Sequence, residues 1–349
     1  MSQSQTPILE LRNLVKTFGW ESPPGPVTAL TRKLRLAAAP RLTYAVDHVS
    51  LSVAPGEVVG LVGESGCGKS TVGRMACGLT EPTAGEVLVH GAPRSGLKGR
   101  GAIDARLALQ MVFQDPFSSL NPRLRISRIL GEAATIHGMT TAQEADDYVC
   151  QLLERVGLDA SMRHRYPHQF SGGQRQRIGI ARALAVQPQM LVCDEAVAAL
   201  DVSIQAQILN LFMDLRDELG LSYLFISHDL GVIEHICDRV VVMYLGRVVE
   251  TAPVAELFER PNHPYTQALL AHVPRISQRN VSFASIKGEI PSPMSPPSGC
   301  HFHPRCPHAM PRCTQEVPEL KRVAEGHMSA CHLNDEHTPK RNPRSSIHE

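Results

Sequence analysis

The strongest chemical signal in the sequence is a glycine-rich loop suited to binding phosphate. Residues 63–70 are Gly-Glu-Ser-Gly-Cys-Gly-Lys-Ser, which fits the pattern Gly-x4-Gly-Lys-Ser/Thr. The glycines let the backbone N–H groups turn inward toward phosphate oxygens, and a following helix adds its positive N-terminal end. We expect Lys69 to reach the β- and γ-phosphates and the Ser70 hydroxyl to bind Mg²⁺. A chance Gly-rich turn is the alternative, but the apolar run before the loop and the helical pattern after it favour the phosphate site.

Two consecutive carboxylates, Asp194 and Glu195, follow the apolar run 190–193. Asp194 suits the role of a Mg²⁺ ligand in a phosphate-transfer enzyme, and Glu195 is then placed to polarise an attacking water. In isolation, the same pattern is also typical of a strand followed by an acidic helix start. Its presence beside the phosphate loop in one chain favours the catalytic interpretation.

A serine–glycine turn and a histidine complete the set of candidate residues. Ser171-Gly172-Gly173-Gln174 precedes an arginine-rich helical segment, and a Ser-Gly turn at a helix start is a second geometry that binds anions. Alone, it indicates only a capped helix. His228 follows the apolar run 223–226. A histidine at a strand end is usually structural, but beside a phosphate site it can contact the γ-phosphate and orient water.

Four of the nine cysteines, Cys300, Cys306, Cys313 and Cys331, fall within 32 residues. Their spacing lacks the tight Cys-x2-Cys pair of common zinc ribbons and does not match ferredoxin patterns. A region with few core residues needs a cross-link to fold stably, and four thiolates bound to one metal centre supply such a cross-link. Unrelated cysteines in a loose tail are the alternative.

Alternating apolar runs and amphipathic segments must position these residues, and they predict a parallel α/β sheet with antiparallel additions. We expect strands at 8–15, 45–53, 58–62, 87–89, 107–113, 190–193, 223–226, 239–244 and 247–250. We expect helices at 69–79, 125–137, 142–157, 172–186 and 203–219. Residues 19–43 contain Pro-Pro-Gly-Pro and are predicted to form an inserted loop.

Composition places a domain boundary near residue 275. Residues 281–349 hold 10 of the 26 prolines and 7 of the 16 histidines, and apolar periodicity fades there. We therefore predict a larger domain at 1–275, a small Cys-rich module at 276–335 and a disordered tail at 336–349.

The charge balance gives no global attraction to nucleic acid. The 349 residues carry 35 Lys+Arg and 34 Asp+Glu, and residues 281–349 carry 8 basic and 7 acidic side chains, so there is no basic arm. The start of the chain lacks the apolar core of a secretory signal, and no stretch approaches the roughly 20 apolar residues of a membrane span. A cytosolic location follows, where clustered thiols stay reduced and bind metal more often than they pair.

Taken together, the motifs resemble those of the ATP-binding subunits of ABC transporters, in family order over residues 63–228. The resemblance implies a P-loop ABC ATPase cassette: a mixed sheet core, an antiparallel β part and a helical subdomain at about 115–185. It makes Gln114 the Q-loop glutamine, Ser171–Gln174 the signature and Asp201 the end of the D-loop, with Glu195 and His228 catalytic. The implied nucleotide contacts are Gly63, Ser65, Gly66, Cys67, Gly68, Lys69, Ser70, Thr71, Gln114 and Asp194, and the implied Mg²⁺ ligands are Ser70, Gln114 and Asp194.

In this family two cassettes form a head-to-tail sandwich, so Lys69 and Ser171 are expected to serve different ATP sites. The residues implied for the opposite site are Ser171, Gly172, Gly173, Gln174 and Asp201. An aromatic residue upstream of the loop stacks on adenine, and we favour Phe18 over Trp20 and Tyr44 for this role.

Residues 170–177 (Phe-Ser-Gly-Gly-Gln-Arg-Gln-Arg) look like the F-type subunit of the oligopeptide/dipeptide permease branch. Further motifs are similar to this branch. They are the segment 114–122 (Gln-Asp-Pro-Phe-Ser-Ser-Leu-Asn-Pro), 243–246 (Met-Tyr-Leu-Gly), 263–266 (His-Pro-Tyr-Thr) and 305–307 (Arg-Cys-Pro). This branch carries a [4Fe–4S] cluster on four cysteines, which favours iron–sulfur over zinc at Cys300, Cys306, Cys313 and Cys331.

The branch also implies the partners and the location. We expect a D-type ATP-binding subunit as heterodimer partner, two integral membrane permease subunits, an indirect link to a solute-binding protein, and no nucleic acid. The expected location of the protein is peripheral, at the cytoplasmic face of the inner membrane. The expected cargo is di- or oligopeptides, with nickel, glutathione or opines as alternatives. There are two rival functions. One is a soluble ABC ATPase acting on nucleic acid or ribosomes, and the other is a non-enzymatic nucleotide switch.

Two positions depart from the family pattern. Ala196 follows the catalytic glutamate where proline is usual, and Ala199 begins the D-loop where serine or threonine is usual. The missing hydroxyl of Ala199 predicts slower hydrolysis or altered coupling, while Glu195 and His228 preserve activity.

Overall fold

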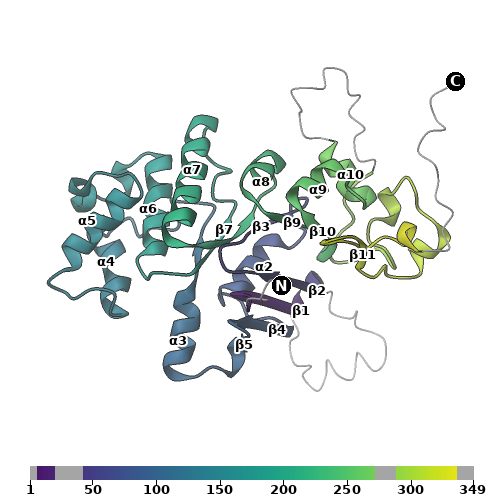
Figure 1. Cartoon of the computed structure of the whole chain (residues 1–349), viewed down its shortest axis with the longest axis horizontal. Helices are drawn as coiled ribbons and strands as arrows, with labels where there is room; N and C mark the ends of the chain where they lie inside the picture. The colour runs from purple at the N-terminus through teal and green to yellow at the C-terminus, as the bar shows by residue number, and fades with distance from the viewer. Residues whose placement is uncertain (1–5, 20–41, 272–287, 336–349) are drawn as a thin grey trace, which may run out of the picture.

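A computed structural model describes residues 6–19, 42–271 and 288–335 (Figure 1). The predicted tail at 336–349 lies outside these residues. So do the predicted boundary between residues 275 and 276, residue Trp20 and nearly all of the insertion predicted at 19–43.

The centre of the molecule is an eight-stranded mixed sheet with the order β11-β12-β10-β9-β3-β8-β7-β6. Strands β6, β7, β8, β3 and β9 run parallel, and β10, β12 and β11 continue the sheet antiparallel. Every residue of β3, β7 and β8 is buried, which explains why these segments are continuous apolar runs without alternation. The strands are β3 Val58–Val62, β6 Leu109–Val112, β7 Met190–Asp194, β8 Ser222–Ile226, β9 Arg239–Tyr244, β10 Arg247–Pro253, β11 Lys321–Ala324 and β12 His327–Ser329.

A second, antiparallel sheet has the order β2-β1-β4-β5 and is formed by β1 Leu9–Phe18, β2 Thr43–Val53, β4 Ala84–Val89 and β5 Ala92–Pro93. Helix α2 (Lys69–Ala76) packs between the two sheets, with its buried Val72 and Met75 in one apolar cluster with Leu11 and Leu61. Figure 1 shows α2 in this position. The predicted combination of a mixed sheet and an antiparallel sheet is confirmed.

The remaining helices join consecutive strands or cover the main sheet. Their bounds are α3 Gly99–Ala108, α7 Val202–Leu219, α8 Leu230–Ile236, α9 Val254–Glu259 and α10 Pro264–Leu270. Helix α3 was not predicted, and its last residues take the beginning of the strand expected at 107–113. Its weak separation of apolar and polar faces gives little helical periodicity, with only Ala105 and Ala108 buried.

Three helices gather at the end of the molecule opposite the C-terminal segment (Figure 1). They are α4 Ile126–Ile136, α5 Ala145–Arg155 and α6 Gly172–Leu184. Short 3₁₀ turns at η2 Ala160–His164 and η3 Pro167–Gln169 connect α5 to α6. The buried side chains of Leu130, Leu153 and Ile178 belong to the same apolar cluster as the main sheet, so this helical part is packed firmly onto it.

The described C-terminal segment, residues 288–335, is joined to the central sheet, and a separate Cys-rich module is not supported. Strand β12 pairs with β10 and so extends the central sheet, and Phe302 is buried in the main apolar cluster. Besides β11 and β12, the segment contains three short 3₁₀ turns, η4 His303–Arg305, η5 Pro311–Thr314 and η6 His332–Asn334. A further 3₁₀ turn, η1 Arg94–Gly96, follows β5. Strand β10 has backbone groups along its outer edge that need hydrogen-bond partners, and a strand distant in sequence can supply them. Local sequence periodicity does not reveal such pairing, so it could not be predicted.

A buried carboxylate joins this segment to the rest of the protein. Glu250 on β10 is fully buried and accepts hydrogen bonds from the backbone of Asn262 and His263 at 2.7 and 3.0 Å. His327 on β12 lies with Nε2 2.7 Å from the same carboxylate. Because an unpaired buried charge is costly, these contacts hold β10, the start of α10 and β12 together.

Candidate functional site

The phosphate loop joins the end of β3 to the start of α2. Gly63, Gly66 and Gly68 have φ angles of 150°, 79° and 104°, a region that favours glycine. A Cβ atom on Gly63 would lie 2.2 Å from the carbonyl oxygen of Met243, and one on Gly68 would lie 2.1 Å from that of Ala45. Two of the three glycines are therefore required by close backbone packing as well as by the turn. Ser65 and Gly66 are exposed at the crest of the loop.

Lys69 is buried and turned back onto its own loop. Its ammonium group donates to the carbonyl oxygens of Gly63 at 2.7 Å and Glu64 at 3.1 Å. Cys67, in the same loop, is buried against Gly63, and burial raises the pKa of its thiol. These contacts keep the positive charge of Lys69 at the mouth of the glycine cradle, where a phosphate group needs it.

The pair expected to hold Mg²⁺ is assembled. The Ser70 hydroxyl donates to Asp194 Oδ1 at 2.7 Å, although 124 residues separate them in the chain. Burial raises the pKa of Asp194, and the Ser70 hydrogen bond opposes that shift. A hydroxyl and a carboxylate side by side at a phosphate loop are the oxygen donors that Mg²⁺ takes in nucleotide sites, so these residues fit the ion.

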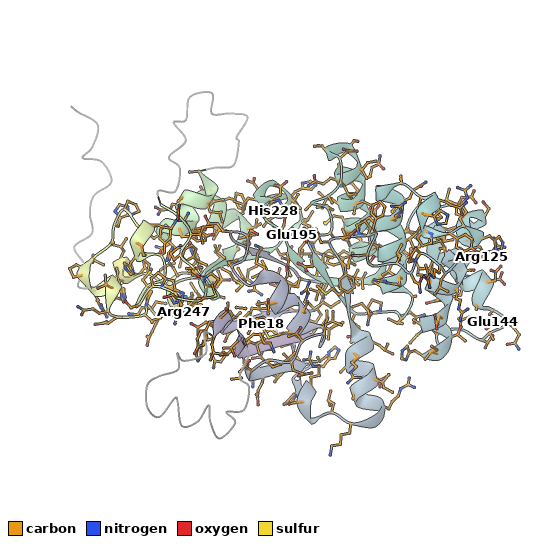
Figure 2. All side chains as sticks on the ribbon, turned by 180° about the vertical axis from the view of Figure 1, so that it is seen from behind. Phe18, Arg125, Glu144, Glu195, His228 and Arg247 are labelled. Atoms are coloured by element: carbon orange, nitrogen blue, oxygen red, sulfur yellow. The ribbon has the colours of Figure 1, made fainter. Side chains whose placement is uncertain are left out.

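Glu195 contacts two other predicted site residues, Gln114 and His228. Gln114 Nε2 donates to its Oε2 at 2.7 Å, and His228 Nδ1 lies 3.4 Å from its Oε1. Figure 2 shows Glu195 and His228 next to each other. Gln114, Glu195 and His228 follow β6, β7 and β8, respectively. These three strands are adjacent and parallel, so their carboxyl ends share one edge of the sheet. This edge is also where the phosphate loop leaves β3.

The backbone of Glu195 is itself unusual. Its φ angle is +49°, a conformation that side-chain-bearing residues seldom adopt and that clusters at functional sites. The Glu195 N–H donates to the carbonyl oxygen of Ile226 at 3.0 Å, which holds the residue against the end of β8.

The signature residues lie at the start of α6 and stand apart from the phosphate loop of the same chain. Ser171 caps the helix, accepting from Gln174 N at 3.3 Å, while Gln174 Oε1 accepts from Ser171 N at 3.0 Å. Among the described residues, no hydrogen bond or ion pair joins Ser171–Gln174 to residues 63–70. Asp201 precedes α7 and is exposed, without a side-chain cap on that helix. The structure therefore does not bring these five residues to the site of Lys69.

The predicted adenine-stacking residue also remains separate from this cluster. Phe18 ends β1, is 47% exposed, and has Lys16 Nζ 5.4 Å from its ring centre. Its place on the antiparallel sheet is seen in Figure 2. Tyr44 on the neighbouring β2 is similarly exposed, so geometry does not distinguish the two.

Two residues near the site were missed by the sequence reasoning. Phe117, in the loop after Gln114, is 63% exposed and has the Arg175 guanidinium 3.7 Å from its ring centre. This contact links the loop to α6, at the residue that directly follows the signature. Glu64, in a variable position of the phosphate loop, binds the C-terminal segment. In the sequence, Phe117 is marked only by its place in the branch-specific run 114–122. Glu64 is marked only by its negative charge in a loop that binds anions.

The four C-terminal cysteines line one small cavity, together with His263, Phe302 and His332. Burial raises the pKa of the Cys306 thiol to about 11 and that of Cys331 to about 12, and it also raises the pKa of Cys300. Yet no group of three or more His, Cys, Asp or Glu side chains is arranged as a metal site in the described part of the chain. The predicted iron–sulfur or zinc site is therefore not supported as a preformed site. Protonated thiols pack as apolar groups and need no common centre.

Comparisons with known proteins agree with this geometry. The family model for the ABC transporter matches residues 46–198, and that for the oligopeptide/dipeptide transporter C-terminal region matches residues 249–313. The oligopeptide transport ATP-binding protein AppF of Bacillus subtilis is 50% identical over 336 residues, covering 95% of this chain and 98% of that protein. The dipeptide transport ATP-binding protein DppF of Haemophilus influenzae is 49% identical, covering 86% of this chain and 92% of that protein.

Solved structures show the same fold. The dimeric structure of MJ0796, a bacterial ABC transporter cassette, has a TM-score of 0.59 at 26% identity, covering 70% of this chain and 98% of that one. The cassette cbiO1 from Clostridium perfringens has a TM-score of 0.58 at 26% identity, covering 73% of this chain and 92% of that one.

The fold and the site define a P-loop ATPase of the ATP-binding cassette class, and the enzyme activity is ATP hydrolysis. Within that class, the chain belongs to the ATP-binding subunits of oligopeptide/dipeptide ABC transporters, which confirms the resemblance found in the sequence.

Proposed function

We propose that the chain energises the import of di- or oligopeptides through a membrane permease. The observation that carries this proposal is that similarity to peptide-transport ATP-binding proteins extends over 95% of the chain, including the C-terminal region. Importers of nickel, glutathione or opines are the alternative cargo within the same branch. A soluble ABC ATPase acting on nucleic acid or ribosomes is less consistent with the balanced charge.

The residues of the site suggest a division of roles in ATP hydrolysis. Lys69 and the backbone of residues 63–71 bind the phosphates. Ser70, Asp194 and Gln114 would hold Mg²⁺, which would neutralise charge on the phosphates. Glu195 accepts a proton from the attacking water, and His228, beside Glu195, positions the γ-phosphate. Phe18 stacks on the adenine ring.

The signature residues serve the ATP site of a partner cassette. Ser171, Gly172, Gly173, Gln174 and Asp201 are placed apart from Lys69 in this chain, and related cassettes are described as dimers. A D-type ATP-binding subunit is the partner that we propose. A sandwich of two cassettes closes when ATP bridges them and opens after hydrolysis, which drives motion in attached subunits.

Two permease subunits anchor this pair at the cytoplasmic face of the inner membrane, and a solute-binding protein supplies cargo indirectly. In the described residues no helix combines the length and apolar character that a bilayer span requires. Attachment through the permease is therefore proposed, with Phe117 and the loop after Gln114 as the contact.

Glu195→Gln tests the central assignment. In the assembled complex, loss of the general base is expected to lower ATP turnover at least ~100-fold while ATP binding is retained. Uptake of labelled di- and oligopeptides into proteoliposomes should fall in parallel. Glu234→Gln, an exposed carboxylate change on α8, is the matched control. Normal turnover in Glu195→Gln, or uptake of nickel or glutathione instead of peptides, contradicts the corresponding part of the proposal.

We also propose that Cys300, Cys306, Cys313 and Cys331 hold a [4Fe–4S] cluster with a structural role. The support is that all four cysteines line one cavity, although they lie in or beside three different 3₁₀ turns, η4, η5 and η6. Ligation requires thiolates, so cluster assembly releases protons and draws the sulfur atoms together.

Anaerobic purification decides between metals. The proposal expects stoichiometric iron and sulfide with a visible thiolate-to-iron absorption band. Both should be lost in Cys313→Ser and retained in Cys150→Ser, a change on α5. A colourless protein with stoichiometric zinc would overturn it. The limits that we propose for the parts of the chain remain 1–275 for the nucleotide-binding domain, 276–335 for the extension built onto it and 336–349 for the tail.

A further inference from the structure

Glu64 connects the phosphate loop to the C-terminal segment across 241 residues of sequence. The Arg305 guanidinium donates from Nη1 to Glu64 Oε2 at 2.7 Å and from Nη2 to Oε1 at 3.0 Å. Such a two-pronged arginine–carboxylate pair fixes orientation as well as distance. The Arg305 side chain is 5% exposed and that of Glu64 is 19% exposed, so solvent screens this pair only weakly.

The backbone of Glu64 is held as well. Its N–H donates to the Tyr265 hydroxyl at 2.9 Å, and its carbonyl oxygen accepts from Lys69 Nζ. Glu64 therefore touches the lysine that binds phosphate on one side and the C-terminal part of the chain on the other. A shift of Glu64 would move a backbone group to which Lys69 is bonded.

An aromatic cluster supports the arginine. The rings of Tyr244, Tyr265 and Phe302 lie with centres 4.7 to 5.4 Å apart, and Arg305 Nη1 also donates to the Tyr244 hydroxyl at 3.2 Å. Phe302 and Arg305 belong to one turn, because Arg305 N donates to Phe302 O at 2.9 Å. The turn is thus anchored in the core, and it presents Arg305 to the loop in one orientation.

The charges give this contact a functional consequence. A carboxylate in the loop would repel the phosphates of ATP, and Lys69 alone cannot neutralise both. Arg305 compensates the Glu64 charge, and removal of the arginine would leave a partly buried, unpaired carboxylate beside the anion site. Removal of both groups would abolish the repulsion and the need for compensation.

We propose that Arg305 is a positioning residue for nucleotide binding, acting through Glu64, so that the C-terminal segment sets the affinity of the phosphate loop for ATP. The inference rests on the ATPase site and does not depend on the transported cargo. It does not require the cysteines to hold a metal.

A double-mutant cycle in the full chain tests this role. The variants are Arg305→Gln, Glu64→Gln, the double variant, Arg305→Lys and the control Arg312→Gln. Arg312 belongs to the same segment but pairs with Glu316 and Asp335, away from the loop. Equilibrium titration with a fluorescent ATP analogue gives Kd, and turnover in the assembled complex gives KM and kcat. Metal content and thermal melting are measured for each variant.

The expected pattern is specific to charge compensation. Arg305→Gln should weaken ATP binding and raise KM about five- to tenfold, the effect of one uncompensated charge near the site, with kcat within about twofold of wild type. Glu64→Gln and the double variant should both bind ATP within about threefold of wild type, because the repelling charge is gone. Arg305→Lys should recover part of the affinity, and Arg312→Gln should change nothing.

Two results would overturn the proposal. One is wild-type affinity in Arg305→Gln. The other is a double variant as weak as Arg305→Gln, especially with a matching loss of metal or of thermal stability, because a purely structural arginine produces that pattern.

Discussion

At the residue scale, the proposed catalytic cluster is organised around Glu195. Its carboxylate contacts Gln114 and lies close to His228, and its backbone adopts a strained φ of +49°. Such a conformation persists only where surrounding structure imposes it, here through the hydrogen bond from Glu195 N to Ile226 O. The site thus depends on individual backbone positions as much as on reactive side chains.

The glycines of the phosphate loop differ in what they require, and alanine substitutions should separate them. Gly68→Ala places a Cβ 2.1 Å from Ala45 O, whereas a Cβ on Gly66 meets nothing within 4 Å. Both changes strain the backbone, but only Gly68→Ala adds a clash, so it should lower the free energy of unfolding by roughly 1–3 kcal/mol more. Denaturant unfolding of the two variants measures this difference, and equal stabilities would contradict it.

The alanine at the start of the D-loop should limit turnover. Ala199 is exposed next to Asp201, where a hydroxyl could donate across a cassette dimer. Ala199→Ser is expected to raise ATP turnover of the assembled complex about two- to tenfold, the worth of one added hydrogen bond. Ala198→Ser, also exposed, is the control. Unchanged turnover in Ala199→Ser would show that the missing hydroxyl is irrelevant.

At the scale of elements, two junctions position the candidate site residues and the C-terminal segment. The carboxyl ends of β6, β7 and β8 bring Gln114, Glu195 and His228 together. On the other side of the sheet, β12 pairs with β10 and places the turn with Arg305 beside the phosphate loop. Both junctions use strand pairing, whose fixed spacing positions residues far apart in sequence.

The second junction should be sensitive to the buried contact between His327 and Glu250. His327→Ala removes one hydrogen-bond partner of the Glu250 carboxylate, which is fully buried. We expect the free energy of unfolding to fall by about 2–5 kcal/mol, with earlier proteolytic cleavage of the C-terminal segment. His235→Ala, at an exposed position of α8, is the control. Equal unfolding of His327→Ala and wild type would show that β12 is held by other contacts.

At the scale of the whole molecule, we propose that the chain contributes one half to each of two ATP sites. Figure 1 shows the signature helix α6 in the helical end of the molecule, with the C-terminal segment at the other end. No hydrogen bond or ion pair crosses from the signature to the phosphate loop within the described ranges. This arrangement is consistent with the proposal that a second cassette, the D-type partner, completes each ATP site.

Ser171→Arg separates binding from assembly. In the isolated chain, ATP affinity should stay within about twofold of wild type, because Ser171 lies outside its own phosphate site. ATP-driven dimerisation with the partner cassette, measured by size-exclusion chromatography with light scattering, should be lost. Ser161→Arg, an exposed change in the helical part, should dimerise normally. Weak ATP binding by isolated Ser171→Arg would contradict the division into two sites.

The enzyme class, the mixed and antiparallel sheets and the cluster of reactive residues could all be predicted from the sequence. Gly63–Ser70, Asp194 and Glu195 could be identified because phosphate chemistry demands particular residue types at short, fixed spacing. The tertiary structure alone decided that the C-terminal segment is part of the central sheet and that Arg305 reaches Glu64. Pairing between strands and ion pairs across 241 residues depend on which surfaces meet in space, and neither leaves a local periodicity in the chain.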